Sequence, residues 1–145
     1  MKPKKILYGV TLSLIMATTI VAANAAAEVV VIVSANSSVT RLTAEQTAKI
    51  FLGKVDNFPH EGSASPIDQP EGRSIRNEFY SKVTNKNSSQ VTAYWAKVIF
   101  TGDGHPPQLL GSDEAVRTAV ANNPNAIGYI DKSAVDDSVR VVLTP

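Results

Sequence analysis

The chain contains no cysteine among its 145 residues, and only two histidines and one tryptophan. The absence of cysteine excludes disulfide bonds, thiolate metal sites, cysteine nucleophiles and a lipid attached through cysteine. The formal net charge is only +1, which gives no electrostatic basis for binding nucleic acid. With 43% hydrophobic and 19% charged residues, the composition is typical of a globular protein of one domain.

Residues that carry out catalysis or bind metal are also scarce. His60 and His105 each lie in a segment rich in glycine and proline, and neither has a second ligand at the spacing typical of zinc sites. No motif of the nucleophile-elbow type is present, and titratable residues form no cluster along the chain. The sequence therefore predicts no metal site, no cofactor and no enzymatic activity.

The first 25 residues have the three-part pattern of a secretory signal peptide. Lys2, Lys4 and Lys5 are followed by an almost uncharged segment, and a small-x-small site stands at residues 23–25. An uncleaved membrane anchor is the alternative, which the short run interrupted by threonine and serine disfavours. Cleavage would leave residues 26–145 as a single domain of mildly acidic charge. Without a cysteine to carry a lipid, such an exported domain is expected to be soluble in a bacterial periplasm.

The remaining sequence alternates between strand and helix patterns. Residues 28–34 contain four valines without polar alternation, which predicts a strand buried on both faces. Apolar spacing predicts helices over residues 43–53 and 70–83, and others beginning at residues 87 and 112. Short strands are predicted at residues 66–68, 126–130 and 139–143. This order indicates an α/β domain in which helices flank a sheet.

Several helix ends carry recognisable signals. Thr43 and Gln46 form a capping box, and Gly53 supplies the left-handed residue that ends this helix. Residues 87–90 begin a further helix with a similar pattern. Asp68 and Glu71 are predicted at the start of the helix over residues 70–83, where they would interact with the positive end of its dipole.

The same helix start is the candidate binding site. A helix N-terminus offers free N–H groups, Gly72 allows close approach to the backbone, and Arg73, Ser74 and Arg76 add guanidinium and hydroxyl donors. These groups suit an oxyanion. The alternative is an ordinary capped helix with surface arginines. The loop over residues 34–38, with Ser34 and Ser37, is predicted as a second rim, because ligands of open α/β sheets gather beyond the carboxyl ends of strands.

Three sequence blocks carry a family resemblance. They are residues 42–54 (LTAEQTAKIFLGK), 79–83 (FYSKV) and 124–130 (PNAIGYI). Their sequence and order resemble the phosphate-binding proteins of bacterial ABC importers, in the type II periplasmic binding protein superfamily. The Asp-Gln-Pro-Glu-Gly segment at residues 68–72, and a tryptophan helix followed by Phe-Thr-Gly, are similar to a short, stand-alone group of that family.

The resemblance implies the fold of a single lobe, whereas full-length relatives close two lobes on the ligand. The anion loop of the family resembles Arg-x-Asp-x-Ser-Gly-Thr at a helix start. Here the leading arginine has no match in residues 68–76, and only Gly72, Ser74 and the helix start correspond. One lobe would supply about half of the donors, and each lost hydrogen bond to a charged group removes about 1.5–3 kcal/mol.

The expected function is that of a non-catalytic periplasmic solute-binding protein for phosphate or another small oxyanion, linked to ABC phosphate transport. Its expected partners are the ligand and an ABC transporter membrane complex or an envelope sensor. A homodimer is a further expectation, since a second copy would restore the missing half of the cleft. The alternative function is an envelope interaction module that has lost small-molecule binding, which a large exposed apolar patch would favour.

Overall fold

The structure, a computed structural model, describes residues 3–4 and 27–145, so the predicted signal peptide lies almost entirely outside the described residues. The described elements follow the expected alternation of strands and helices. They are β1 (Val29–Ser34), α1 (Ala44–Phe51), β2 (Ser65–Asp68), α2 (Ser74–Thr84), α3 (Ser88–Thr101), β3 (Gln108–Leu109), α4 (Asp113–Ala121), β4 (Ala126–Asp131), the 3₁₀ helix η1 (Lys132–Ala134) and β5 (Val139–Leu143). Among these helices, none combines the length and apolar character that crossing a bilayer requires.

The five strands form one mixed sheet in the order β3-β2-β4-β1-β5. Strands β2, β3 and β4 run parallel to one another, whereas β1 runs antiparallel to both of its neighbours, β4 and β5. The carboxyl end of β1 therefore lies at the edge of the sheet where β2 and β4 begin. This direction decides which loops can share a site.

Helices cover both faces of the sheet, as predicted. Alternate residues of β1 point to opposite faces, and all six are buried. Val29, Val31 and Val33 pack with α1, α2 and α3, whereas Val30 and Ile32 pack with α4. The continuous run of valines therefore serves two cores, and the α/β architecture with three layers is confirmed.

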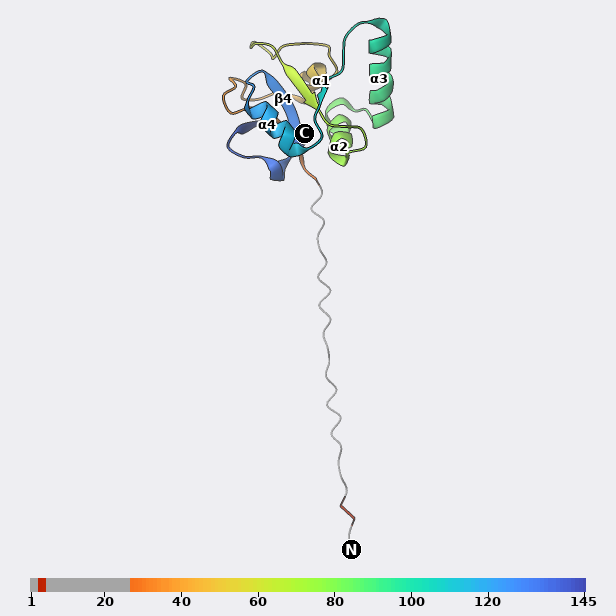
Figure 1. The fold of residues 1–145 in the computed structure, drawn as a ribbon, viewed down its shortest axis with the longest axis vertical. Helices are drawn as coiled ribbons and strands as arrows, with labels where there is room; N and C mark the ends of the chain where they lie inside the picture. Colours follow the sequence, from red (N-terminus) through yellow and green to blue (C-terminus); the bar gives the residue numbers. More distant parts are fainter. Residues whose placement is uncertain (1–2, 5–26) are drawn as a thin grey trace.

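The packing of α4 on the sheet is especially close at Gly128 in β4. A Cβ atom at Gly128 would lie 2.6 Å from Cγ1 of Val116 in α4. On the opposite face, α3 extends along the side of the molecule and returns to the sheet through the long segment that leads to β3 (Figure 1). Its inner face buries Val91 and Trp95.

The predicted capping boxes of α1 and α3 are both present. The Thr43 hydroxyl accepts from the Gln46 amide, the Gln46 side chain accepts from the Thr43 amide, and Asn87 and Gln90 do the same in α3. Gly53 adopts φ +68° directly after Leu52, the C-cap of α1, as predicted.

The start of α2 differs from the sequence prediction. The helix begins at Ser74 and not at Pro70, because Gly72 has φ +92° and Arg73 is extended. Residues 70–73 therefore form a turn that precedes the helix.

Candidate functional site

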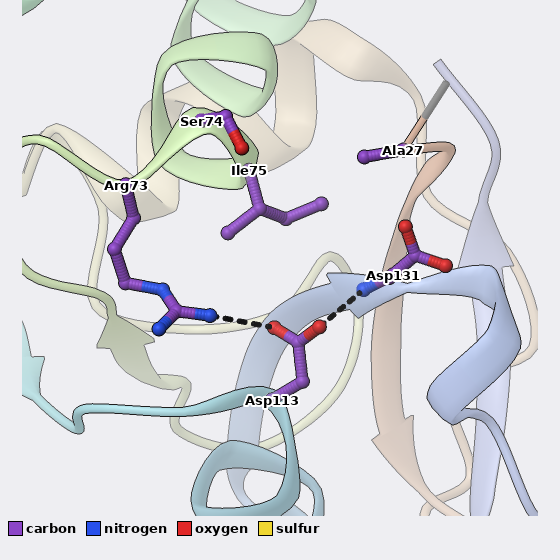
Figure 2. Close-up of a pocket in the computed structure, with 6 residues that line it drawn as sticks. All are labelled: Ala27, Arg73, Ser74, Ile75, Asp113 and Asp131. Atoms are coloured by element: carbon purple, nitrogen blue, oxygen red, sulfur yellow. Dashed lines mark hydrogen bonds and ion pairs between the residues drawn. The ribbon is translucent and has the colours of Figure 1, made fainter. Parts of the chain in front are cut away.

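A pocket of about 330 Å³ lies against the start of α2. We call it the α2-start pocket, and it is lined by Ala27, Arg73, Ser74, Ile75, Asp113 and Asp131. Figure 2 shows that these residues come from the segment before β1, the start of α2, the start of α4 and the end of β4. The pocket thus lies at the edge of the sheet where the parallel strands β2 and β4 end, the usual position of ligands in open α/β sheets.

The N-terminus of α2 is available for an anion. The first N–H groups of a helix have no partner within it, and Arg73, the N-cap, provides no side-chain hydrogen bond to them. No acidic residue occupies the first turn. The positive end of the helix dipole and the guanidinium group of Arg73 therefore reinforce each other at the pocket.

The two acidic residues predicted at this helix start do not cap it, which corrects the sequence prediction. Glu71 instead accepts hydrogen bonds from Ser88 (3.0 Å) and Thr92 (3.3 Å) of α3. Asp68 lies at the end of β2 and points into the core, where it is 2% exposed. The reason is that α2 begins only at Ser74, after a turn over residues 70–73 that contains Glu71 and follows Asp68.

Opposite α2, the pocket wall carries negative charge. Asp113 Oδ1 lies 4.0 Å from Nη2 of Arg73 and accepts a hydrogen bond of 2.8 Å from Nε2 of Gln69. Its other oxygen accepts from the backbone N–H of Asp131 at 3.2 Å, and Figure 2 shows Asp113 between Arg73 and Asp131. Each oxygen of a carboxylate has two lone pairs, so Asp113 retains capacity to accept from a ligand.

Asp131 adds a second carboxylate to this wall. The hydroxyl of Ser133 donates to Asp131 Oδ1 at 2.7 Å, and the backbone N–H of Ser133 donates at 2.9 Å. These hydrogen bonds lower the pKa of Asp131 below its ordinary value, so this carboxylate is charged at neutral pH. The α2-start pocket is therefore bipolar, with donors on the α2 side and carboxylates on the α4 and β4 side.

Beneath the pocket, a buried polar cluster is centred on Asp68. The Asp68 carboxylate accepts from the hydroxyls of Tyr80 (2.6 Å) and Tyr129 and from the backbone N–H of Gln69 (2.7 Å). Nε of Arg76 lies 3.4 Å from its Oδ1. Four groups thus surround one carboxylate, which makes its burial tolerable.

The two tyrosines of this cluster are held in the neutral form. Burial is the main cause that raises the pKa of Tyr80 and of Tyr129 far above the ordinary value, and the neighbouring Asp68 carboxylate raises both further. Tyr80 and Tyr129 therefore act as permanent O–H donors to Asp68. Phe79, next to Tyr80 in α2, stacks on the Tyr129 ring with centroids 4.0 Å apart.

The structure places the predicted α2 donors in two different environments. Arg73 and Ser74 line the pocket. Arg76 is buried one turn later, against Asp68 and over the Tyr80 ring at 4.9 Å. Gly72 shapes the turn through its positive φ and is not among the lining residues. Only part of the predicted set therefore faces a ligand.

The predicted second rim is not brought to this pocket. Ser34 is the last residue of β1, so it lies about 20 Å along the strand from Ala27. Its hydroxyl donates to the carbonyl of Ala121, and Ser37 accepts from the N–H of Val39. The prediction placed the rim beyond the carboxyl end of this strand, and because β1 is antiparallel to β4, that end lies at the opposite edge of the sheet from the pocket.

Sequence reasoning missed Gln69, Asp113 and Asp131 as parts of the site. Asp113 was recognisable only as a first-turn residue of α4, and Asp131 only as the end of a short strand. Gln69, Asp113 and Asp131 come together because β2 pairs in parallel with β4 and because α4 packs beside them. No local sequence pattern encodes either arrangement.

No protein-family model matches the chain. Among solved structures, it is similar to a putative phosphate ABC transporter substrate-binding protein with bound phosphate from Clostridium perfringens. The two share 25% identity and a TM-score of 0.63, over 80% of this chain and 44% of that one. The chain has the fold of one lobe of a phosphate-transport binding protein.

Two further solved structures have a similar fold. An ABC-type phosphate transport receptor from Vibrio cholerae shares 21% identity and a TM-score of 0.63, over 80% of this chain and 45% of that one. PstS from Borrelia burgdorferi shares 16% identity and a TM-score of 0.60, over 80% and 46%. The chain therefore spans less than half the length of these relatives.

Proposed function

We propose that the chain is a periplasmic, non-catalytic solute-binding protein that holds phosphate or another small oxyanion in the α2-start pocket, in connection with ABC phosphate transport. One observation carries the proposal. The uncapped N-terminus of α2 and the Arg73 guanidinium open together on a cavity of about 330 Å³ at the carboxyl ends of the parallel strands. The phosphate bound to the Clostridium perfringens relative supports the choice of ligand.

In this proposal the ligand contacts the N–H groups at the start of α2, the Ser74 hydroxyl and Arg73. Gly72 keeps the turn open, and Arg76 acts from below by neutralising Asp68. The reason for separating these roles is geometric, because Arg76 is buried in the Asp68 cluster whereas Arg73 and Ser74 line the pocket. Ser34 and Ser37 take no part in this arrangement.

The carboxylate of Asp113 favours phosphate among small oxyanions. Phosphate at neutral pH carries at least one O–H, which can donate to a carboxylate oxygen, whereas sulfate carries none. A fully deprotonated anion has no proton to donate and would be repelled by the carboxylates of Asp113 and Asp131. We therefore expect phosphate to bind more tightly than sulfate, and Asp113→Asn to reduce this preference.

Affinity is expected to be modest. A single lobe leaves one side of the ligand in water, and each missing charged hydrogen bond removes about 1.5–3 kcal/mol. Loss of several such bonds weakens binding by orders of magnitude relative to a site closed by two lobes. A partner or a second copy that covers the pocket would recover part of this affinity.

Isothermal titration calorimetry with phosphate and with sulfate tests the site. Arg73→Gln is expected to weaken phosphate binding at least about tenfold, since hydrogen bonds to charged groups contribute about 1.5–3 kcal/mol. The matched control is Arg41→Gln, which removes the same charge from an exposed position outside the pocket. Equal phosphate affinity in both variants and in the unaltered chain would remove Arg73 from the site.

A second candidate function is an envelope interaction module that has lost small-molecule binding. The observation that favours it is the exposure of large apolar side chains on α3, where Phe100 is 92% exposed and Ile99 is 56% exposed. In that case the partner would be an envelope sensor or an ABC transporter complex. Calorimetry that shows no binding of any small oxyanion would favour this function over the first.

A further inference from the structure

Asp131 lines the α2-start pocket with a negative charge that no cation of the described chain pairs with. Its carboxylate accepts from the backbone N–H and the hydroxyl of Ser133, and both donors are neutral. None of the ion pairs formed within residues 27–145 includes Asp131. A ligand that fills the pocket removes water from this carboxylate, and burial of an unpaired charge is costly.

Asp113, the other carboxylate of the pocket, has a different electrostatic environment. One of its oxygens accepts from Gln69 and lies 4.0 Å from Nη2 of Arg73, and the other accepts from the backbone N–H of Asp131. The guanidinium group therefore offsets part of the charge of Asp113. Of the two carboxylates, only Asp131 lacks an opposite charge within the described part of the chain.

Arg73 lies at the opposite end of the pocket. Its Nη1 donates to the carbonyl of Gly111 at 3.0 Å, and a guanidinium group has five N–H donors in all, so Arg73 keeps donors for an oxyanion. Figure 2 shows Arg73 and Asp131 on opposite sides of the pocket, with Asp113 between them. The cationic and anionic ends are thus separated by about the width of one side chain.

The volume of the pocket exceeds what phosphate alone requires. A water molecule takes about 30 Å³ in the liquid, so the pocket of about 330 Å³ corresponds to roughly eleven waters. Phosphate consists of one phosphorus and four oxygen atoms. When phosphate contacts Arg73 and Ser74, space therefore remains on the side of Asp131, and this space lies next to the unpaired negative charge.

We propose that the ligand of the α2-start pocket is a zwitterion, a phosphate monoester or phosphonate that carries an ammonium group on a short alkyl linker. The phosphoryl oxygens accept from Arg73, Ser74 and the first N–H groups of α2, and the ammonium group donates to Asp131. This inference rests on the proposed function, because it keeps the same site and the same phosphoryl contacts and adds the contact with Asp131.

Charge complementarity favours this class over inorganic phosphate and over simple alkyl phosphonates. Neither of these ligands carries a cation for Asp131, and the negative charge of each is repelled by that carboxylate. An ammonium group on the ligand replaces this repulsion by a charge-assisted hydrogen bond, one of the stronger polar contacts in proteins. We therefore expect the zwitterion to bind at least about tenfold more tightly than an equally long ligand without the ammonium group.

Calorimetric titration with aminoethylphosphonate and with propylphosphonate tests the inference. The two probes differ only in the end of the alkyl chain, which is an ammonium group in the first and a methyl group in the second. The purified protein is expected to bind aminoethylphosphonate at least about tenfold more tightly. Equal affinity for the two probes would overturn the zwitterion and leave the oxyanion site intact. Absence of binding of either phosphonate and of phosphate would overturn the proposed function as well.

The variant Asp131→Asn assigns the preference to its residue. An asparagine keeps an oxygen that can accept from Ser133 at the start of η1, but it removes the charge. We expect this variant to lose the preference for aminoethylphosphonate without binding propylphosphonate less tightly. Asp137→Asn is the matched control, since it removes an exposed carboxylate that does not line the pocket. A preference that Asp131→Asn retains, or that Asp137→Asn also loses, would overturn the inference.

The same chemical group occurs in a phospholipid headgroup, so a second measurement distinguishes a free ligand from a membrane. Phosphate in a phospholipid is a diester and keeps fewer free oxygens for Arg73 and Ser74, which favours the free ligand. Co-sedimentation with vesicles of phosphatidylethanolamine and phosphatidylcholine, and with phosphatidylcholine alone, is the test. The protein is expected to remain in solution with both. Binding to the first vesicles that aminoethylphosphonate displaces would identify a headgroup and overturn the free ligand.

Discussion

Asp68 and Arg76 form a buried ion pair at the base of α2, with 3.4 Å between Oδ1 of the carboxylate and Nε of the guanidinium group. The side chain of Asp68 is 2% exposed and that of Arg76 is 9% exposed. The pair lies beneath the α2-start pocket, so it fixes the helix whose first N–H groups face the proposed ligand. Arg76, which the sequence predicts as an anion ligand, therefore pairs with the internal carboxylate of Asp68.

We predict that Arg76→Met lowers the free energy of unfolding by about 3–5 kcal/mol, because it leaves the Asp68 carboxylate buried with no opposite charge. Urea denaturation followed by circular dichroism measures the change. The control is Lys82→Met on the same helix, which breaks a partly exposed pair with Glu78 and should change stability by less than about 1 kcal/mol. Similar losses in the two variants would contradict the role given to the buried pair.

Stability is predicted to fall at alkaline pH through Tyr80 and Tyr129. Their pKa values are raised in the folded state, mainly by burial, so the folded chain keeps both protons above pH 10 while the unfolded chain releases them. The stabilisation of the folded state by these two raised pKa values is complete below the ordinary tyrosine pKa of about 10. Above that pH it declines by about 1.4 kcal/mol per pH unit for each residue.

Denaturation curves between pH 8 and pH 11 check this slope. Tyr80→Phe is expected to be less stable at pH 8, since Asp68 loses a donor, but also to have a shallower decline above pH 10. A decline as steep as that of the unaltered chain would show that Tyr80 does not carry the effect.

Gly128→Ala is predicted to destabilise the chain by about 1–3 kcal/mol through overpacking. The new Cβ would lie 2.6 Å from Cγ1 of Val116 and 3.2 Å from Cγ2 of Val120, so α4 would have to move away from β4. Val116→Ala in the same chain removes the closer of these two contacts. The double variant Gly128→Ala/Val116→Ala should therefore lose less stability than the sum of the losses in the two single variants, as measured by thermal unfolding. Losses that simply add would argue against the contact.

Thr43→Ala is predicted to cost about 1 kcal/mol of stability without changing the affinity for phosphate. Thr43 caps α1 through the Gln46 amide at 3.1 Å, and α1 contributes no residue to the α2-start pocket. Paired denaturation and binding measurements on one preparation check both halves of this prediction. A change in affinity would mean that α1 positions the pocket.

Sequence patterns predicted the local features and failed where distant segments meet. The capping boxes at Thr43 and Asn87 and the buried strand predicted at residues 28–34 depend on neighbouring residues or on hydrophobicity, and all are confirmed. The start of α2 was placed four residues too early, because Pro70 suits a first turn and the positive φ of Gly72 is not visible in the sequence.

The residues of the candidate site were even harder to predict from the sequence. Arg73 and Ser74 were recognised because a helix start is a local signal, and both line the pocket. Asp113 and Asp131 were not, since their position depends on strand order. Ser34 was misplaced for the same reason, because the direction of β1 is set by its pairing with β4 and β5. Strand direction is a property of the whole sheet and has no signature within a single strand.

The proposed function depends most on whether this single lobe binds phosphate at the start of α2. Equilibrium dialysis of the protein against labelled phosphate, at low and at moderate salt and with the molecular mass determined on the same sample, tests it most directly. We predict saturable binding that excess sulfate displaces poorly and that Arg73→Gln weakens. Absence of saturable binding up to millimolar phosphate in the correctly folded protein would contradict the claim and leave the interaction module as the function.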